Sequence, residues 1–234
     1  MKALKQLSSL IILLLVSTSS MLAFQKETRD VDTFTKVSLR TSANVYLTQG
    51  NTQKVEISGK ESDMEKLETK VRDGKLIIDT KDNNGWFNWS GFDNIDVYIT
   101  VKNLEKISVA GSGDMVSKGK FKCDDLDISV AGSGDLEFET DAKDIEISIA
   151  GSGSVVLSGS SNINEVSIAG SGKLDAEEME TDSYQISIAG SGKCTVHAKN
   201  EITSKITGSG SVYYKGDPKR VNNNSNGSGK IRKI

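Results

Sequence analysis

ISVAGSGD, residues 107–114, is the first of seven copies of one short motif that recurs to the end of the chain. The later copies are ISVAGSGD (128–135), ISIAGSGS (147–154), VSIAGSGK (166–173), ISIAGSGK (186–193), SKITGSGS (204–211) and NNSNGSGK (223–230). Their first glycines are 18 to 21 residues apart. Such a regular period is typical of a solenoid, in which each repeat forms one coil that stacks on the next.

Apolar and polar residues alternate on both sides of each Gly-Ser-Gly. In the second copy, Ile128 and Val130 flank Ser129, and Leu136 and Phe138 follow the glycines. This period of two predicts two short strands, each with one buried face. Because glycine adopts positive φ at little steric cost, Gly-Ser-Gly predicts the corner between them. We expect the strand serines to form one outward column: Ser108, Ser129, Ser148, Ser167 and Ser187.

These patterns predict an all-β protein, a right-handed parallel β-helix with Gly-Ser-Gly coils of about 19–20 residues. The regular coils occupy residues 107–215. Residues 24–106 contain strand-like runs without the motif, and we expect them to form a divergent N-terminal β part of the solenoid or its cap. Residues 216–234 contain a degenerate repeat with Asn in place of aliphatic residues, followed by a tail. A polar last repeat suits a cap, because a bare solenoid edge promotes aggregation.

Residues 1–23 have the pattern of a secretory signal peptide. Lys2 and Lys5 precede the apolar run LIILLLV (10–16), and small residues lead to Ala23. The run is far shorter than the roughly 18 apolar residues that read as a membrane span. We therefore expect an exported protein with no membrane span after cleavage, located in the periplasm, at the cell surface or outside the cell.

The charge and the metal-binding residue types exclude several functions. Loss of residues 1–23 removes two lysines and no acid, which changes the net charge from −3 to −5. This argues against nucleic acid as a partner, because phosphate binding needs clustered Lys and Arg. Cys123 and Cys194 lie several coils apart, too far for a disulfide. His197 has no metal-ligand spacing around it, so no metal or other cofactor is expected.

One aromatic cluster is the candidate ligand-binding site. Its members are Trp86, Phe87, Trp89 and Phe92, within GWFNWSGF (85–92). Large aromatics among Asn, Ser and Gly suit recognition of a glycan or a surface protein. The alternative is structural, because the open end of a solenoid also needs apolar bulk to cap it.

Two further patterns allow both a functional and a structural interpretation. Asp114 and Asp135 follow the corner in successive coils and would stack about 5 Å apart, as catalytic acids or calcium ligands do. The same position holds Ser154 and Lys173 in later coils, which favours a solvated column. The serine column could bind a glycan or a second solenoid side by side, or could simply face water.

Three stretches resemble one bacterial family. They are TFTKVSLRTSANVYLTQG (33–50), DGKLIID (73–79) and DVYITVKNLEKISVAGSGD (96–114), followed by the AGSG coils. Together they resemble the family described as "putative auto-transporter adhesin, head GIN domain" over about residues 30–215. Lys102 stands where members commonly have Pro. The resemblance implies an exported β-helical protein with an envelope or surface role, and it brings no catalytic residues.

The leading hypothesis is therefore an exported, non-enzymatic binding module of the cell envelope or surface, adhesin-like in its role. Its expected partner is a glycan or a surface protein, and self-association is a further option. The first alternative is a periplasmic structural or regulatory solenoid. The second is a β-helical enzyme acting on polysaccharide, with Asp114 and Asp135 as its acids.

Overall fold

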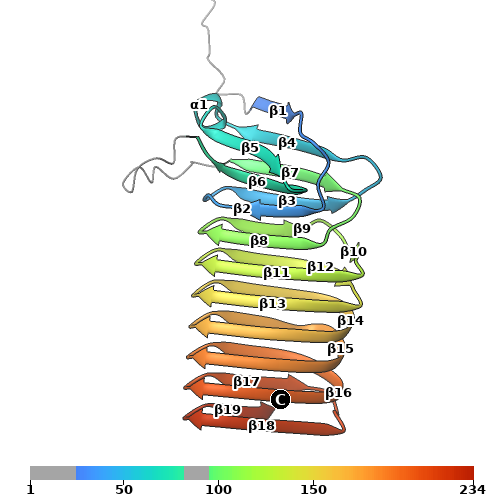
Figure 1. The fold of residues 1–234 in the computed structure, drawn as a ribbon, viewed down its shortest axis with the longest axis vertical. Coiled ribbons are helices and arrows are strands. Elements are labelled where there is room, and N and C mark those ends of the chain that lie inside the picture. Colours follow the sequence, from blue (N-terminus) through green and yellow to red (C-terminus); the bar gives the residue numbers. More distant parts are fainter. Residues whose placement is uncertain (1–24, 82–94) are drawn as a thin grey trace, which may run out of the picture.

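A computed structural model describes residues 25–81 and 95–234. Within these residues, nineteen strands form one continuous hydrogen-bonded network, accompanied by one short helix. Figure 1 shows a tall stack of similar coils below an irregular N-terminal part. The all-β solenoid predicted from the repeats is confirmed.

Each coil contributes one strand to each of two faces, which we call face A and face B. Face A holds the strand that ends at the first glycine of each corner, and face B holds the strand that begins after the corner. Face A comprises β8 (Lys106–Gly111), β11 (Asp125–Gly132), β13 (Asp144–Gly151), the second halves of β14 (Ser154–Gly170), β15 (Lys173–Gly190) and β16 (Lys193–Gly208), and β18 (Arg220–Gly227). Face B comprises β9 (Asp114–Ser117), β12 (Asp135–Asp141), the first halves of β14, β15 and β16, β17 (Ser211–Lys215) and β19 (Lys230–Lys233). The two-residue β10 (Phe121–Lys122) lies on a return turn.

Neighbouring coils are parallel and in register. Ile128 pairs with Ile107 of the preceding coil and with Ile147 of the following coil. The corners follow the same register, since Gly132 pairs with both Gly111 and Gly151. Each coil therefore satisfies the backbone groups of its neighbour, as a parallel ladder requires.

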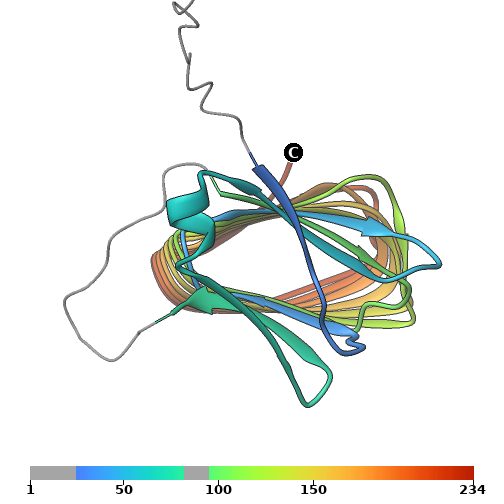
Figure 2. The ribbon, with the colours of Figure 1, turned by 90° about the horizontal axis from the view of Figure 1, so that it is seen from above.

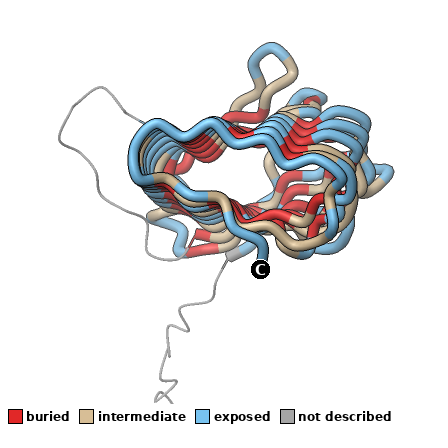
Figure 3. The backbone as a smooth tube through the Cα atoms, turned by 90° about the horizontal axis from the view of Figure 1, so that it is seen from below, coloured by how far each residue is buried: buried red, intermediate tan, exposed pale blue. Residues whose placement is uncertain are grey.

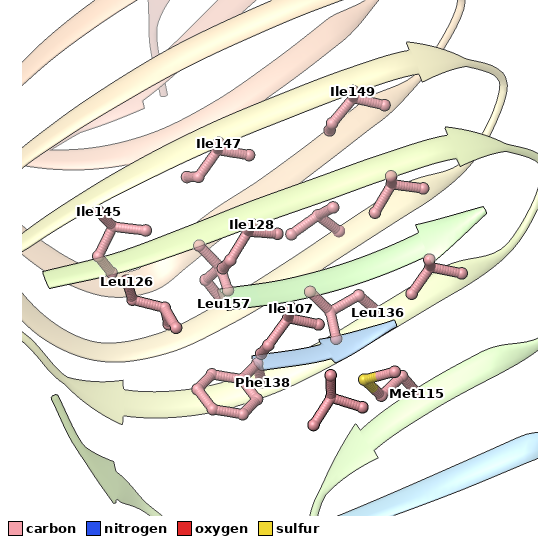
Figure 4. Packing of buried hydrophobic residues seen from close by; sticks show 14 of the residues in the cluster. Ile107, Met115, Leu126, Ile128, Leu136, Phe138, Ile145, Ile147, Ile149 and Leu157 are labelled. Carbon is pink, nitrogen blue, oxygen red and sulfur yellow. The ribbon is translucent and has the colours of Figure 1, made fainter. Parts of the chain in front are cut away.

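The core is a column of aliphatic side chains between the two faces. Ile107, Ile128 and Ile147 stack along face A and are fully buried (Figure 4). Phe121 and Phe138 pack with ring centroids 4.8 Å apart on the other side of the column. Seen end-on, the coils superimpose as a flattened ring with buried residues alternating along its wall (Figure 3). Stacking thus covers apolar layers that one coil could not bury alone.

One buried polar cluster interrupts this column. The Ser161 hydroxyl donates to Oδ1 of Asn164 at 2.8 Å, and Nδ2 of Asn164 donates to Oγ1 of Thr181 at 3.0 Å. Thr181 donates in turn to the hydroxyl of Tyr184, also at 3.0 Å. Burial raises the pKa of the Tyr184 phenol. Each group has a partner, as buried polar atoms require.

The N-terminal part begins with one more coil. Strands β2 (Lys36–Leu39) and β3 (Asn44–Gln49) pair in parallel with β8 and β9. Val37 lies opposite Ile107, and Val45 lies opposite Met115. A Cβ on Gly113 would lie 2.5 Å from the carbonyl oxygen of Thr41, so the corner here stacks on Thr41 and its neighbours as later corners stack on glycines.

The layer above this coil comes later in the chain. Strands β6 (Lys75–Thr80) and β7 (Asp96–Val101) pair in parallel with β2 and β3 on the side away from β8 and β9. The order of layers therefore differs from the order of the sequence, because β6 and β7 lie above a coil that precedes them in the chain, and β8 and β9 lie below it.

Antiparallel strands close the top of the stack (Figure 2). Strand β4 (Lys54–Gly59) pairs with β7 and with β1 (Gln25–Arg29), and β5 (Leu67–Arg72) forms a hairpin with β6. Asp73 and Gly74 form the turn of this hairpin, with φ of 52° and 68°. The segment 61–70 contains both the helix α1 (Glu61–Met64) and the start of β5.

The last coil carries polar residues at inward positions. Asn223 and Ser225 occupy the register of Ser204 and Ile206 in the coil before. Ser204 donates to Oδ1 of Asn223 at 2.8 Å, and Asn223 exchanges hydrogen bonds with Ser225. Asn223 and Ser225 are exposed, which explains why an amide and a hydroxyl serve there in place of isoleucine.

Candidate functional site

The aromatic cluster predicted from sequence, Trp86, Phe87, Trp89 and Phe92, lies outside the described residues. The candidate site is therefore built from the outward surfaces of the two faces.

A ladder of serines runs along face A. Register places Ser108, Ser129, Ser148, Ser167 and Ser187 on successive strands, so the predicted column is confirmed. The ladder continues to Ser38 of β2, which is buried beside the cap. Neighbouring hydroxyls are separated by one strand spacing, about 4.8 Å. A parallel column of alanines, among them Ala150, leaves the ladder unobstructed on one side.

A shallow groove of about 320 Å³ follows this ladder across four coils. Ser148, Ser167 and Ser187 lie along it, and Glu146 and Glu165 line one side. The groove offers hydroxyl, carboxylate and amide groups at a constant interval. Such a surface can hydrogen-bond a partner whose own polar groups repeat along one direction.

Carboxylates gather where face A meets the return turns. A hollow of about 670 Å³ there is lined by Glu105, Asp124, Asp125, Asp127 and Asp144, among others. Two of these acids are neutralised. Lys143 lies 2.6 Å from Asp124, and Lys106 lies 2.5 Å from Asp127. Within residues 25–81 and 95–234, no group of three or more His, Cys, Asp or Glu side chains is placed to hold a metal ion.

Asp114 and Asp135 are exposed at the start of their face B strands. The adjacent pairs Met115 with Leu136 and Val116 with Glu137 show that the two coils stack in register here. Asp135 accepts the backbone N–H of Ser154 at 3.0 Å, which anchors this carboxylate to the next coil. The acid hydrogen-bonds to backbone and faces solvent, as side chains of a surface column do.

Stacked aromatic and cationic side chains form a second surface feature, on face B near the cap. Tyr46 and Tyr98 stack with centroids 5.1 Å apart, Lys26 lies over Tyr98 at 5.4 Å, and Lys118 lies over Tyr46 at 4.5 Å. Burial, and then the charge of Asp96, raise the pKa of both phenols. Sequence reasoning missed this stack, although NVYLTQ (44–49) and DVYITV (96–101) place their tyrosines alike. Because lysines cover the outer ring faces, the stack is closed to a flat ligand.

Both thiols are free. Cys194 lies in the core, and burial raises its pKa. Cys123 is half-buried beside the acidic hollow, and burial raises its pKa as well. A thiol with a raised pKa is a poor nucleophile, so neither side chain has the character of a catalytic cysteine.

The described residues define a capped parallel β-solenoid whose face A carries a ladder of serine side chains. A family model described as "putative auto-transporter adhesin, head GIN domain" matches residues 33–218. The chain belongs to this family, and the resemblance seen in its sequence is confirmed.

Solved structures show the same architecture. A protein of Bacteroides fragilis titled a putative adhesin is 24% identical, with a TM-score of 0.81 over 91% of this chain and 97% of its own. A protein of Parabacteroides distasonis titled a putative lipid binding protein is also 24% identical, with a TM-score of 0.73 over 90% and 96% of the two chains. A putative adhesin of Parabacteroides merdae is 20% identical, with a TM-score of 0.71 over 90% and 96%. At these identities the likeness shows a shared fold.

A comparison with curated proteins gives no match. Across the part of the chain that the structure describes, no helix has the length and apolar character to span a membrane.

Proposed function

We propose that this protein is an exported, non-enzymatic binding module of the cell envelope or cell surface, adhesin-like in its role. The observation that carries the proposal is the accessible part of the serine ladder on face A, in register from Ser108 to Ser187. It supports binding of a repetitive, hydroxyl-rich partner, and a surface glycan has that chemistry. Membership of an adhesin family supports the same role.

The rigidity of the ladder matters for such binding. The serines sit on strands whose inward neighbours, such as Ile147 and Ile149, are fully buried, so the ladder cannot shift without disrupting the core. A preorganised surface loses little entropy when it binds, and many weak hydrogen bonds then add up along the contact. The proposal therefore requires an extended ligand and predicts weak binding of single sugars.

Substitution on the ladder tests the proposal. In Ser148→Arg plus Ser167→Arg, two long side chains would obstruct the groove without entering the core. Ser133→Arg plus Ser152→Arg is the matched control, because these serines are exposed at the corners, off the ladder. Labelled protein should bind bacterial surface polysaccharide, and only the ladder variant should lose binding. Equal binding by all three proteins would refute the ladder as the contact surface, and catalytic cleavage of the polysaccharide would refute the non-enzymatic role.

A further inference from the structure

Six cations surround one groove beside the cap, where face A begins. The groove has a volume of about 550 Å³ and is lined by eight residues, of which the basic ones are Lys36, Arg40, Lys70, Arg72, Lys75 and Lys106. Asp73 is the one acid in its lining, and Ile77 is its one apolar residue. This concentration of positive charge contrasts with the net negative charge of the chain.

Four of these cations form a row across adjacent strands. Arg72 of β5 lies opposite Lys75 of β6, Lys75 lies opposite Lys36 of β2, and Lys36 lies opposite Lys106 of β8. Like charges directly opposite one another destabilise a sheet, and neighbouring strands are only about 4.8 Å apart. The next strand along this row carries Asp127, which pairs with Lys106 at 2.5 Å. Lys106 therefore has an opposite charge on the strand below it, whereas within the row each cation faces another cation.

The row is only partly neutralised by the protein. Arg40 is 3.7 Å from Asp79, and Lys70 is 2.5 Å from Glu68. Lys36, Arg72 and Lys75 form no ion pair with any described residue. Lys36 and Lys75 are also half-buried, so water screens their mutual repulsion less than it would at a fully exposed site.

We propose that this groove binds the phosphate groups of a phosphorylated sugar. A phosphate carries nearly two negative charges and offers three acceptor oxygens, so one group can neutralise two neighbouring cations of the row. The forked guanidinium of Arg72 suits such an oxyanion, and the lysines supply further charge-assisted hydrogen bonds. A row four strands long has room for more than one phosphate.

A soluble sugar phosphate fits the groove better than a lipid surface does. Surfaces that insert into the interface of a bilayer place exposed apolar side chains beside their cations. Here the one apolar lining residue, Ile77, is 6% exposed and offers nothing to insert into a bilayer. The groove therefore has the positive charge needed to bind a phosphate, but it lacks the exposed apolar side chains that would insert into a bilayer.

Titration calorimetry of the mature chain tests the inference, with fructose 1,6-bisphosphate, inorganic phosphate and vesicles of mixed neutral and anionic phospholipid as probes. The bisphosphate should bind most tightly, and its affinity should fall as salt concentration rises. Lys36→Gln plus Lys75→Gln should weaken binding by about tenfold or more for each cation removed, because charge-assisted hydrogen bonds are lost. Lys173→Gln plus Lys219→Gln, the control, removes the same charge at exposed positions away from the groove and should bind normally.

A stability measurement on the free proteins separates a binding role from a structural one. If the cations of the row repel one another, Lys36→Gln plus Lys75→Gln should have a melting temperature no lower than that of the parent in low salt. Any increase in melting temperature should become smaller as salt is added. The inference is overturned if fructose 1,6-bisphosphate does not bind, if inorganic phosphate binds as tightly, if only vesicles bind, or if the control variant loses as much affinity. This site and the serine ladder can fail independently, because the ladder variants leave the row intact.

Discussion

Replacing Gly151 by alanine tests how much the stacking of corners contributes to stability. Gly151 has φ of +119°, and a Cβ there would lie 2.5 Å from the carbonyl oxygen of Gly132 in the coil before. The obstacle is backbone, so no rotation of a side chain relieves it. Gly119, in a surface turn, has φ of +98° with nothing within 4 Å of its Cβ position. The pair therefore separates the cost of positive φ from the cost of the collision.

Both variants place an L side chain in a backbone region that costs about 1–3 kcal/mol. Gly151→Ala adds overpacking between two coils, which costs about a further 1–3 kcal/mol. We expect Gly119→Ala to lose about 1–3 kcal/mol and Gly151→Ala about 2–6 kcal/mol, in equilibrium urea unfolding followed by circular dichroism. Ser152→Ala, between the corner glycines and exposed, should stay within about 0.5 kcal/mol of the parent. Equal losses for Gly119→Ala and Gly151→Ala would refute the role assigned to corner stacking.

Three further substitutions or labels probe other parts of the structure. Ile147→Ala should cost about 2–5 kcal/mol in thermal or urea unfolding, because Ile147 is fully buried between two coils, whereas Ser148→Ala should change little; similar costs for both would contradict the inward and outward assignment. Thr181→Val should lower the free energy of unfolding by about 1–3 kcal/mol, because Ser161, Asn164 and Tyr184 each lose a hydrogen-bond partner. Thr207→Val, at an exposed position, is its control. If Thr181→Val is as stable as the parent, the buried cluster does not contribute to stability. A maleimide should label Cys123 slowly at neutral pH and Cys194 only after unfolding, because burial raises the pKa of both thiols and encloses Cys194 fully. If mass spectrometry finds Cys194 labelled in the native protein, its place in the core is wrong.

The repeats predict most of the solenoid because one physical rule applies to every coil. Ile128, Ser129 and Val130 have the same roles as Ile147, Ser148 and Ile149, so a single register places all of them. The coil of β2 and β3 obeys the same rule even without glycine at its corner. The top of the stack does not, because β6 and β7 lie above a coil that precedes them in the chain. No local pattern encodes which layer a returning segment joins.

The surface features were harder to predict than the core. The serine ladder follows from period two. The cationic row instead depends on the pairings of Lys36 with Lys75 and with Lys106, which lie 39 and 70 positions away in the sequence. In sequence these lysines look like ordinary solvated residues at strand ends. The tyrosine stack on face B arises from the same non-sequential layering, since Tyr46 and Tyr98 become neighbours only when β7 stacks on β3. The aromatic cluster at 86–92 stays a prediction.

Protease treatment of the producing cells tests whether the protein is exported to the envelope or surface. Protease is added to intact cells, to cells with a permeabilised outer membrane and to lysed cells, and the chain is followed by immunoblotting with a cytoplasmic protein as control. If the protein is exported, the chain should have lost about 23 residues from its N-terminus, and protease should cleave it in the first or second sample while the cytoplasmic control stays intact. A full-length chain that is protected until lysis, together with the control, would contradict export.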